Sequence, residues 1–179
     1  SLSTQASRKA ITVRNVTLAQ SLLAMPRPLR LIDDHLVYHV INRGNNRAPV
    51  FHDDGDYEAF LQAVGDLKPR RPFAFHGYCL MPSHIHLLIR PLETPISRIM
   101  QSLLVSHTLR YHRCHGGGGH VWQGRFKSPV VQDGEHLRTV LRYIESNPLR
   151  VGMVESAGEH RWSSFAARGL GRPDPLLDP

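Results

Sequence analysis

Two histidines separated by one aliphatic residue stand at the head of an apolar run, His-Ile-His-Leu-Leu-Ile, at residues 84–89. In a β-strand, successive side chains point to opposite faces. His84 and His86 therefore lie on one face, and Ile85, Leu87 and Ile89 lie on the other. The run predicts a strand that packs one face on a core and carries two imidazoles side by side on the other.

The elements around this strand follow the order strand, helix, strand, strand, helix, strand, helix. β-branched and aromatic residues favour strands, and apolar residues three and four apart favour amphipathic helices. The sequence predicts strands at residues 36–41, 73–81 and 84–90, a strand or bent ribbon at 121–131, and helices at 54–68, 95–114 and from 133 or 134 to Asn147. This order is typical of an α+β domain with a ferredoxin-like antiparallel sheet and helices packed on one face.

The 179 residues favour a single domain. Residues 1–24 are rich in small and polar side chains and are too polar for a secretory signal. We expect a poorly ordered N-terminal extension at 1–24, one domain at 25–167 and a C-terminal tail at 168–179. No run approaches the roughly 18 apolar residues of a membrane span, so no membrane partner is expected. The 2 cysteines fit a reducing cytoplasm.

The chain carries a formal net charge of +7 and has a pI near 10.0, which favours a polyanionic partner such as nucleic acid. The turn at residues 42–47 holds two arginines among Asn and Gly, a composition that suits phosphate contacts as well as a solvated turn. Residues 121–131 interleave aromatic and cationic side chains, which suits base stacking. Core packing is the alternative for Trp122 and Phe126.

Tyr143 and Asn147 are four residues apart, so they are neighbours on one side of the third long helix, at the edge of its apolar stripe. If this helix packs beside the histidine face, a phenol and an amide join the two imidazoles. Imidazoles and an amide oxygen are acceptable ligands for a divalent ion, which could stabilise charge on a phosphodiester. A phenol is a weak nucleophile until it is activated.

The residue types alone leave other interpretations open. The two histidines could lie on the surface without a metal, and Tyr143 could be a core residue. A zinc-dependent hydrolase is also conceivable, with a zinc site formed by Cys79, His84, His86 and Cys114.

Five segments carry a more specific pattern: residues 38–47, 78–88 with Met-Pro-Ser-His-Ile-His, 120–128 with Trp-Gln-Gly-Arg-Phe-Lys, 142–152 with Tyr-Ile-Glu-Ser-Asn-Pro, and Trp-Ser-Ser at 162–164. Together they span about residues 25–167. In these segments the chain resembles the REP-associated tyrosine transposases, relatives of the single-tyrosine HUH transposases of bacterial insertion sequences.

The resemblance implies an HUH endonuclease-like fold in which His84 and His86 bind Mg²⁺ or Mn²⁺, with Asn147 as the third ligand. It implies that Tyr143 attacks a DNA phosphate, forms a 5′-phosphotyrosine bond and releases a 3′-OH. The partner would be single-stranded DNA with hairpins, and the protein a monomer or homodimer. The residues expected to bind DNA are Arg43, Asn45, Asn46, Arg47, Trp122, Gln123, Arg125, Lys127, Arg142 and Arg150. A non-catalytic nucleic-acid-binding domain is the alternative.

Overall fold

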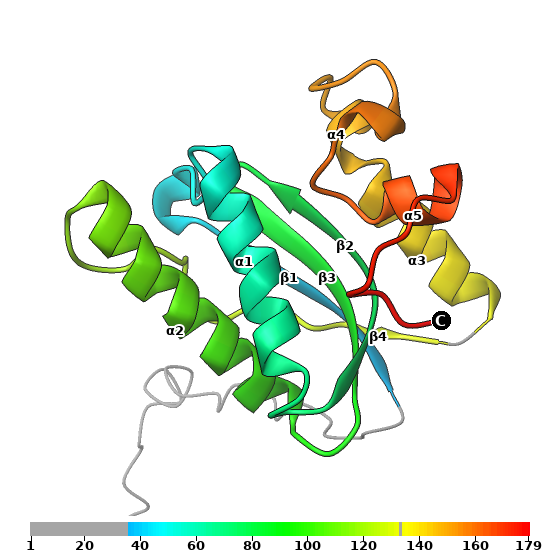
Figure 1. Ribbon diagram of the computed structural model, residues 1–179, viewed down its shortest axis with the longest axis horizontal. Helices are drawn as coiled ribbons and strands as arrows, with labels where there is room; N and C mark the ends of the chain where they lie inside the picture. The colour runs from blue at the N-terminus through cyan, green and yellow to red at the C-terminus, as the bar shows by residue number, and fades with distance from the viewer. Residues whose placement is uncertain (1–35, 133) are drawn as a thin grey trace, which may run out of the picture. The chain divides into compact units, whose positions relative to one another are not determined.

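The computed structural model describes residues 36–132 and 134–179 (Figure 1). Strands β1 (Val37–Arg43), β2 (Phe73–Met81), β3 (His84–Pro91) and β4 (Val130–Val131) form one antiparallel sheet in the order β2-β3-β1-β4. The helices are α1 (Asp54–Leu67), α2 (Ile96–His115), α3 (Glu135–Glu145), α4 (Asn147–Arg150) and α5 (Phe165–Leu170), with 3-10 turns η2 (Asn45–Arg47) and η3 (Ala157–Glu159). The predicted α+β, ferredoxin-like class is confirmed. None of the described helices is long and apolar enough to cross a membrane.

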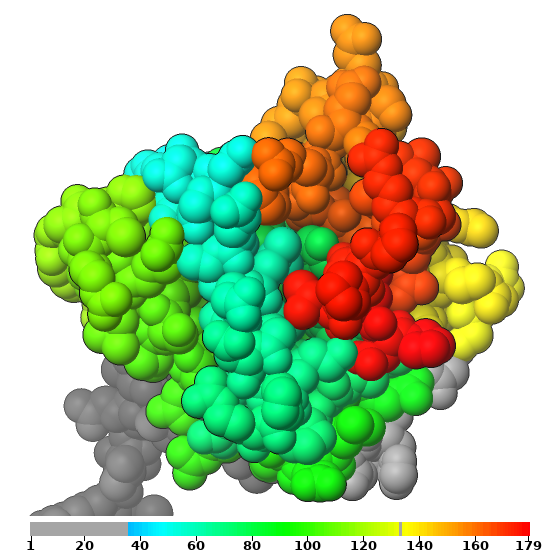
Figure 2. Space-filling model, in the orientation of Figure 1, coloured from blue at the N-terminus to red at the C-terminus, as the bar shows by residue number. Residues whose placement is uncertain are grey.

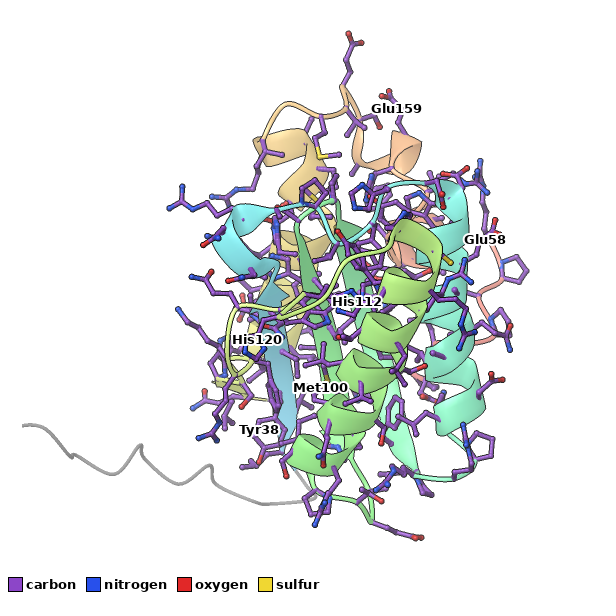
Figure 3. The ribbon with its side chains drawn as sticks, turned by 90° about the vertical axis from the view of Figure 1, so that its left-hand side faces the viewer. Tyr38, Glu58, Met100, His112, His120 and Glu159 are labelled. Carbon is purple, nitrogen blue, oxygen red and sulfur yellow. The ribbon has the colours of Figure 1, made fainter. Side chains whose placement is uncertain are left out.

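Helices α1 and α2 cover one face of the sheet (Figure 1). Ile85, Leu87 and Ile89 of β3 point to this face and are fully buried, as the alternation predicts. Tyr38 of β1 and Met100 of α2 belong to the same core and are labelled in Figure 3, where α2 lies in front of the sheet. Each such buried side chain stabilises the fold by about 1.5–3 kcal/mol relative to an exposed one.

Helix α3 lies on the opposite face, so the predicted placement of the helices on one face holds for α1 and α2 only. The cause is its own apolar stripe, which packs on Leu88 and Cys79 of the sheet and buries Ile144 completely. Gly77, beside the irregularity in the β2–β3 register, is where α3 and β2 approach closely. A methyl group there would overlap Cδ1 of Leu141.

The segment predicted as a strand or bent ribbon at 121–131 is a bent ribbon. Only its end forms β4, and before that it touches the first strand through isolated bridges, Ile41 with Lys127 and Gly44 with Trp122. Gly124 bends the ribbon with a φ of 62°, a left-handed conformation that glycine adopts without strain.

The C-terminal residues pack back onto the domain, as Figure 2 shows for the red segment beside α1. The Asp178 carboxylate accepts hydrogen bonds from Lys68 Nζ and from the backbone N–H of Phe75, each at 2.7 Å. Residues 168–179 therefore contact both the helical layer and β2. The extension predicted at residues 1–24 lies outside the described residues.

Replacing Gly77 tests the position of α3. Gly77→Ala should lower the free energy of unfolding by about 1–3 kcal/mol because the new methyl group overfills the α3–β2 contact. Leu141→Ala in the same chain removes the side chain that it meets. The two substitutions should therefore be non-additive by at least about 0.5 kcal/mol in urea denaturation. Gly118→Ala, which adds a methyl group in open space, is the control. Additive effects would contradict this placement of α3.

Candidate functional site

Three histidines share the sheet face that α3 partly covers. His84 and His86 come from β3, and His39 comes from β1, where it is paired with Leu88. His39 and His86 are 8% and 6% exposed, and His39 Nε2 lies 2.9 Å from His86 Nδ1 in a hydrogen bond. The ring centroids of His86 and His84 are 5.1 Å apart. The predicted histidine pair is thus part of a cluster of three.

These histidines are neutral at neutral pH. Burial lowers the pKa of His86 to about 3, with smaller contributions from its neighbours His39 and His84. Burial also lowers the pKa of His39 to about 4. The pKa of His84 is lowered by burial and by the guanidinium of Arg43. Because neutral imidazole is the form that binds metals, the cluster is ready to accept one without losing protons.

In both His84 and His86, the Nδ1 atom forms a hydrogen bond with another side chain of the protein. Ser83 Oγ lies 3.2 Å from Nδ1 of His84, and His39 occupies Nδ1 of His86. No residue in the described part of the chain forms a hydrogen bond with Nε2 of either ring. The two Nε2 atoms are therefore the ones left to act on a ligand.

The last turn of α3 brings Tyr143 to this cluster within the same chain. Its ring centroid lies 6.4 Å from those of both His39 and His86, and its side chain is 43% exposed. Asn147, at the start of α4, is 8% exposed. Its Nδ2 donates to the backbone carbonyls of Tyr143 and Ile144 at 3.1 and 3.2 Å, so these bonds leave the side-chain oxygen uncommitted. The helix predicted to reach Asn147 ends at Glu145, so Asn147 belongs to the separate helix α4 and stays next to Tyr143 through the hydrogen bond to its carbonyl.

A guanidinium lies over the Tyr143 ring. The Cζ atom of Arg150 is 4.9 Å from the ring centroid, a cation–π contact. Such a contact stabilises an exposed pair by about 0.5–1 kcal/mol and restrains the tyrosine. Arg142 is exposed on α3, one residue before Tyr143. Both arginines that the sequence assigned to DNA binding in this segment therefore flank the tyrosine along the chain.

The polar turn after β1 lies next to the histidines because Arg43 is paired with His84 in the register of β1 and β3. Asn46 and Arg47 have φ values of 51° and 61°, and hydrogen bonds hold the turn, including one from Asn45 N–H to the Val121 carbonyl at 2.8 Å. Four residues predicted to bind DNA are exposed here: Arg43, Asn45, Asn46 and Arg47.

The ribbon at 121–131 adds further cations beside this turn. The Gln123 N–H donates to the Arg43 carbonyl at 2.8 Å, and Gln123, Arg125 and Lys127 are exposed. Trp122 differs from the prediction. It is 7% exposed in the core, with its ring 5.0 Å from that of His107, so its ring is not available for stacking on a base. The core alternative describes both Trp122 and Phe126.

Sequence reasoning missed the place of His39 in the site. The strand predicted at residues 36–41 contains it, and alternation puts it on the face opposite the α1–α2 core. The sequence does not give the register in which β1 pairs with β3. Only that register shows that His39 lies beside His86.

The alternative zinc site is not assembled. Cys79 is buried beneath α3, whereas Cys114 is exposed on α2, which packs on the other face of the sheet. Within residues 36–132 and 134–179, no three His, Cys, Asp or Glu side chains are grouped so that they could hold a metal ion. A metal in this region would need a donor set that includes an amide.

A ferredoxin-like sheet with paired histidines facing a helical tyrosine agrees with the expectation drawn above from the resemblance to single-tyrosine transposases. The family model described as "Transposase IS200 like" matches residues 33–147, more than half of the chain. The chain therefore belongs to this family.

Two known proteins define the likeness further. The chain is 25% identical over 138 residues to a REP-associated tyrosine transposase of Escherichia coli (strain K12), covering 74% of this chain and 79% of that protein. A solved structure of a REP-associated tyrosine transposase bound to a REP hairpin superposes with a TM-score of 0.67 at 23% identity, covering 87% of this chain and 95% of that one. The structural likeness shows the fold, and the predicted resemblance to this group is confirmed.

The two cysteines should differ sharply in reactivity. Burial, followed by the nearby Glu145 carboxylate, raises the pKa of Cys79 to about 12, so its reactive thiolate is scarce at pH 8. Ellman's reagent should modify a single thiol of the native protein quickly, and Cys114→Ser should abolish that phase. The second thiol should react only after unfolding. Two fast thiols would contradict the burial of Cys79 beneath α3.

Proposed function

We propose that this protein is a single-stranded DNA transposase that cleaves and rejoins DNA beside hairpins, with Tyr143 as the nucleophile. The observation that carries the proposal is the 6.4 Å between the ring centroids of Tyr143 and His86 in one chain. Membership of the IS200-like family supports it. The hairpin bound to the structurally similar transposase supports the substrate class.

A divalent metal fits the residues present. His84 and His86 are neutral, no residue in the described ranges forms a hydrogen bond with their Nε2 atoms, and Asn147 can offer its amide oxygen. This neutral donor set would leave the ion its full charge for a phosphate. Mg²⁺ or Mn²⁺ bound here would supply Lewis-acid polarisation of the phosphoryl oxygens.

The protein's own contribution is the nucleophile and its placement. The Tyr143 oxygen attacks the phosphorus, the bond from phosphorus to the 3′ oxygen breaks, and that oxygen leaves as a 3′-OH after taking a proton. The phenolic proton passes to a base or to water, and the 5′ phosphate stays on the tyrosine. Attack by another 3′-OH reverses the step and restores the phenol. Arg150 restrains the ring for this attack.

DNA would reach the site across two groups of cations. The first lies along the turn and ribbon, with Arg43 next to His84, and the second follows Tyr143 with Arg142 and Arg150. Contacts of this kind bind phosphates without reading bases, and they make affinity fall with salt. Hairpin shape and unpaired flanks would then supply selectivity.

A covalent adduct tests the proposal. The wild-type protein is incubated with Mn²⁺ or Mg²⁺ and a pool of single-stranded DNA hairpins that carry randomised flanks and a 3′-terminal fluorophore. The label should become protein-linked on a denaturing gel, because the tyrosine retains the 5′ phosphate of the 3′ fragment. Tyr143→Phe should form no adduct yet bind DNA in a gel shift. Tyr111→Phe is the control, since Tyr111 also contacts a histidine, His52.

Two results would contradict the mechanism. An adduct in Tyr143→Phe would exclude this tyrosine as the nucleophile. DNA binding without any adduct in the wild-type protein, unchanged by chelator and by His84→Ala, would support the alternative of a non-catalytic nucleic-acid-binding domain.

A further inference from the structure

The proposed chemistry uses two of the three clustered histidines and gives His39 no role. Yet His39 is 8% exposed and commits Nε2 to His86 at 2.9 Å, with the two rings stacked at an interplanar angle of 29°. Its position is fixed by the sheet, because β1 and β3 pair directly. A polar side chain held so rigidly beside a candidate ligand calls for a functional explanation.

The hydrogen bond decides which nitrogen of His86 carries the proton. A neutral imidazole has one N–H donor and one bare nitrogen. If His39 donates, Nδ1 of His86 is the bare atom and its Nε2 carries the hydrogen. If His86 donates from Nδ1, its Nε2 has a free lone pair. Only the second arrangement lets His86 bind a metal through Nε2.

We propose that His39 is a positioning residue whose Nε2 accepts the Nδ1–H of His86 and thereby turns the lone pair of His86 Nε2 toward a divalent metal. The ligand role of His86 rests on the proposed function. The tautomer of His86 is a property of the metal-free protein and can be measured on its own. In this arrangement His39 carries its own proton on Nδ1 and binds no metal through Nε2.

Partners that hold a ligating histidine in this way contribute substantially to metal binding. Loss of such a partner typically weakens affinity by about 10–100-fold. His39→Phe keeps a ring in the stack but removes the acceptor, so it should weaken Mn²⁺ binding by that factor. His39→Gln, whose side-chain oxygen can accept the same hydrogen bond, should restore part of the loss. His107→Phe removes a buried histidine from the opposite side of the sheet and serves as the control.

The experiment has two readouts besides catalysis. Long-range ¹H–¹⁵N spectra of the metal-free wild-type protein near pH 7.5 should show His86 protonated on Nδ1 and bare on Nε2. Electron paramagnetic resonance titration of Mn²⁺ then measures affinity in the wild-type protein and the variants, with circular dichroism as the check of folding. Partial rescue by His39→Gln separates a hydrogen-bonding role from a packing role. The tautomer measurement needs no variant, so it stands even if His39→Phe fails to fold.

The possible outcomes distinguish failure of the proposed role of His39 from failure of the proposed DNA cleavage. A proton on Nε2 of His86 in the metal-free protein would overturn the inference. So would Mn²⁺ binding that needs His84 and His86 but is unchanged by His39→Phe, although the proposed function would then stand. Failure of the wild-type protein to bind Mn²⁺ both alone and with hairpin DNA would overturn both. Mn²⁺ binding that depends on His39 in a protein that forms no DNA adduct would support the inference and refute the cleavage chemistry.

Discussion

The antiparallel pairing of β1 with β3 is the constraint on which the site depends. It places Ile41 opposite His86 and His39 opposite Leu88, so that His39 reaches Nδ1 of its diagonal neighbour His86 on the same face. A slip of one residue would turn every side chain of β1 to the other face. His39 would then enter the α1–α2 core. The apolar side chains on that face hold the register, so the burial that stabilises the fold also aligns the polar cluster.

Helix α3 covers part of the sheet face that carries the histidines and leaves the rest of that face accessible. Along the sheet, Leu88 and Cys79 meet the apolar stripe of the helix, whereas the histidines lie toward its last turn, where Tyr143 is half-exposed. If α3 packed on the sheet along its whole length, it would cover the histidines. If it lay further from the sheet, Leu88 would be exposed to water. The small volume of Gly77 lets α3 approach β2 closely. The contact of Leu141 with Gly77 therefore helps to set the position of Tyr143, two residues further along the helix.

Local patterns predicted most of this architecture because they reflect local physics. Alternation gave the shared face of His84 and His86, and helical spacing gave the neighbouring positions of Tyr143 and Asn147. Three features depend on contacts between distant residues and could not be read this way. They are the side of the sheet that α3 covers, the hydrogen bond of His39 to His86, and the burial of Trp122 against His107. An aromatic residue among cations looks the same in sequence whether it faces DNA or the core.

The charges around the proposed site would couple the binding of a metal ion to the binding of DNA. Its histidines are neutral, and Arg43 and Arg150 add positive charge next to His84 and Tyr143. The carboxylate of Glu145, close in sequence, is buried and accepts a 2.6 Å hydrogen bond from Ser164. A divalent cation held by His84, His86 and Asn147 would therefore meet repulsion that a DNA phosphate relieves. By linkage, the ion and the phosphate would strengthen each other's binding to the same extent. Full affinity for the metal would then develop only with substrate in place, where the ion's charge would act on the phosphate that the proposed nucleophile Tyr143 would attack.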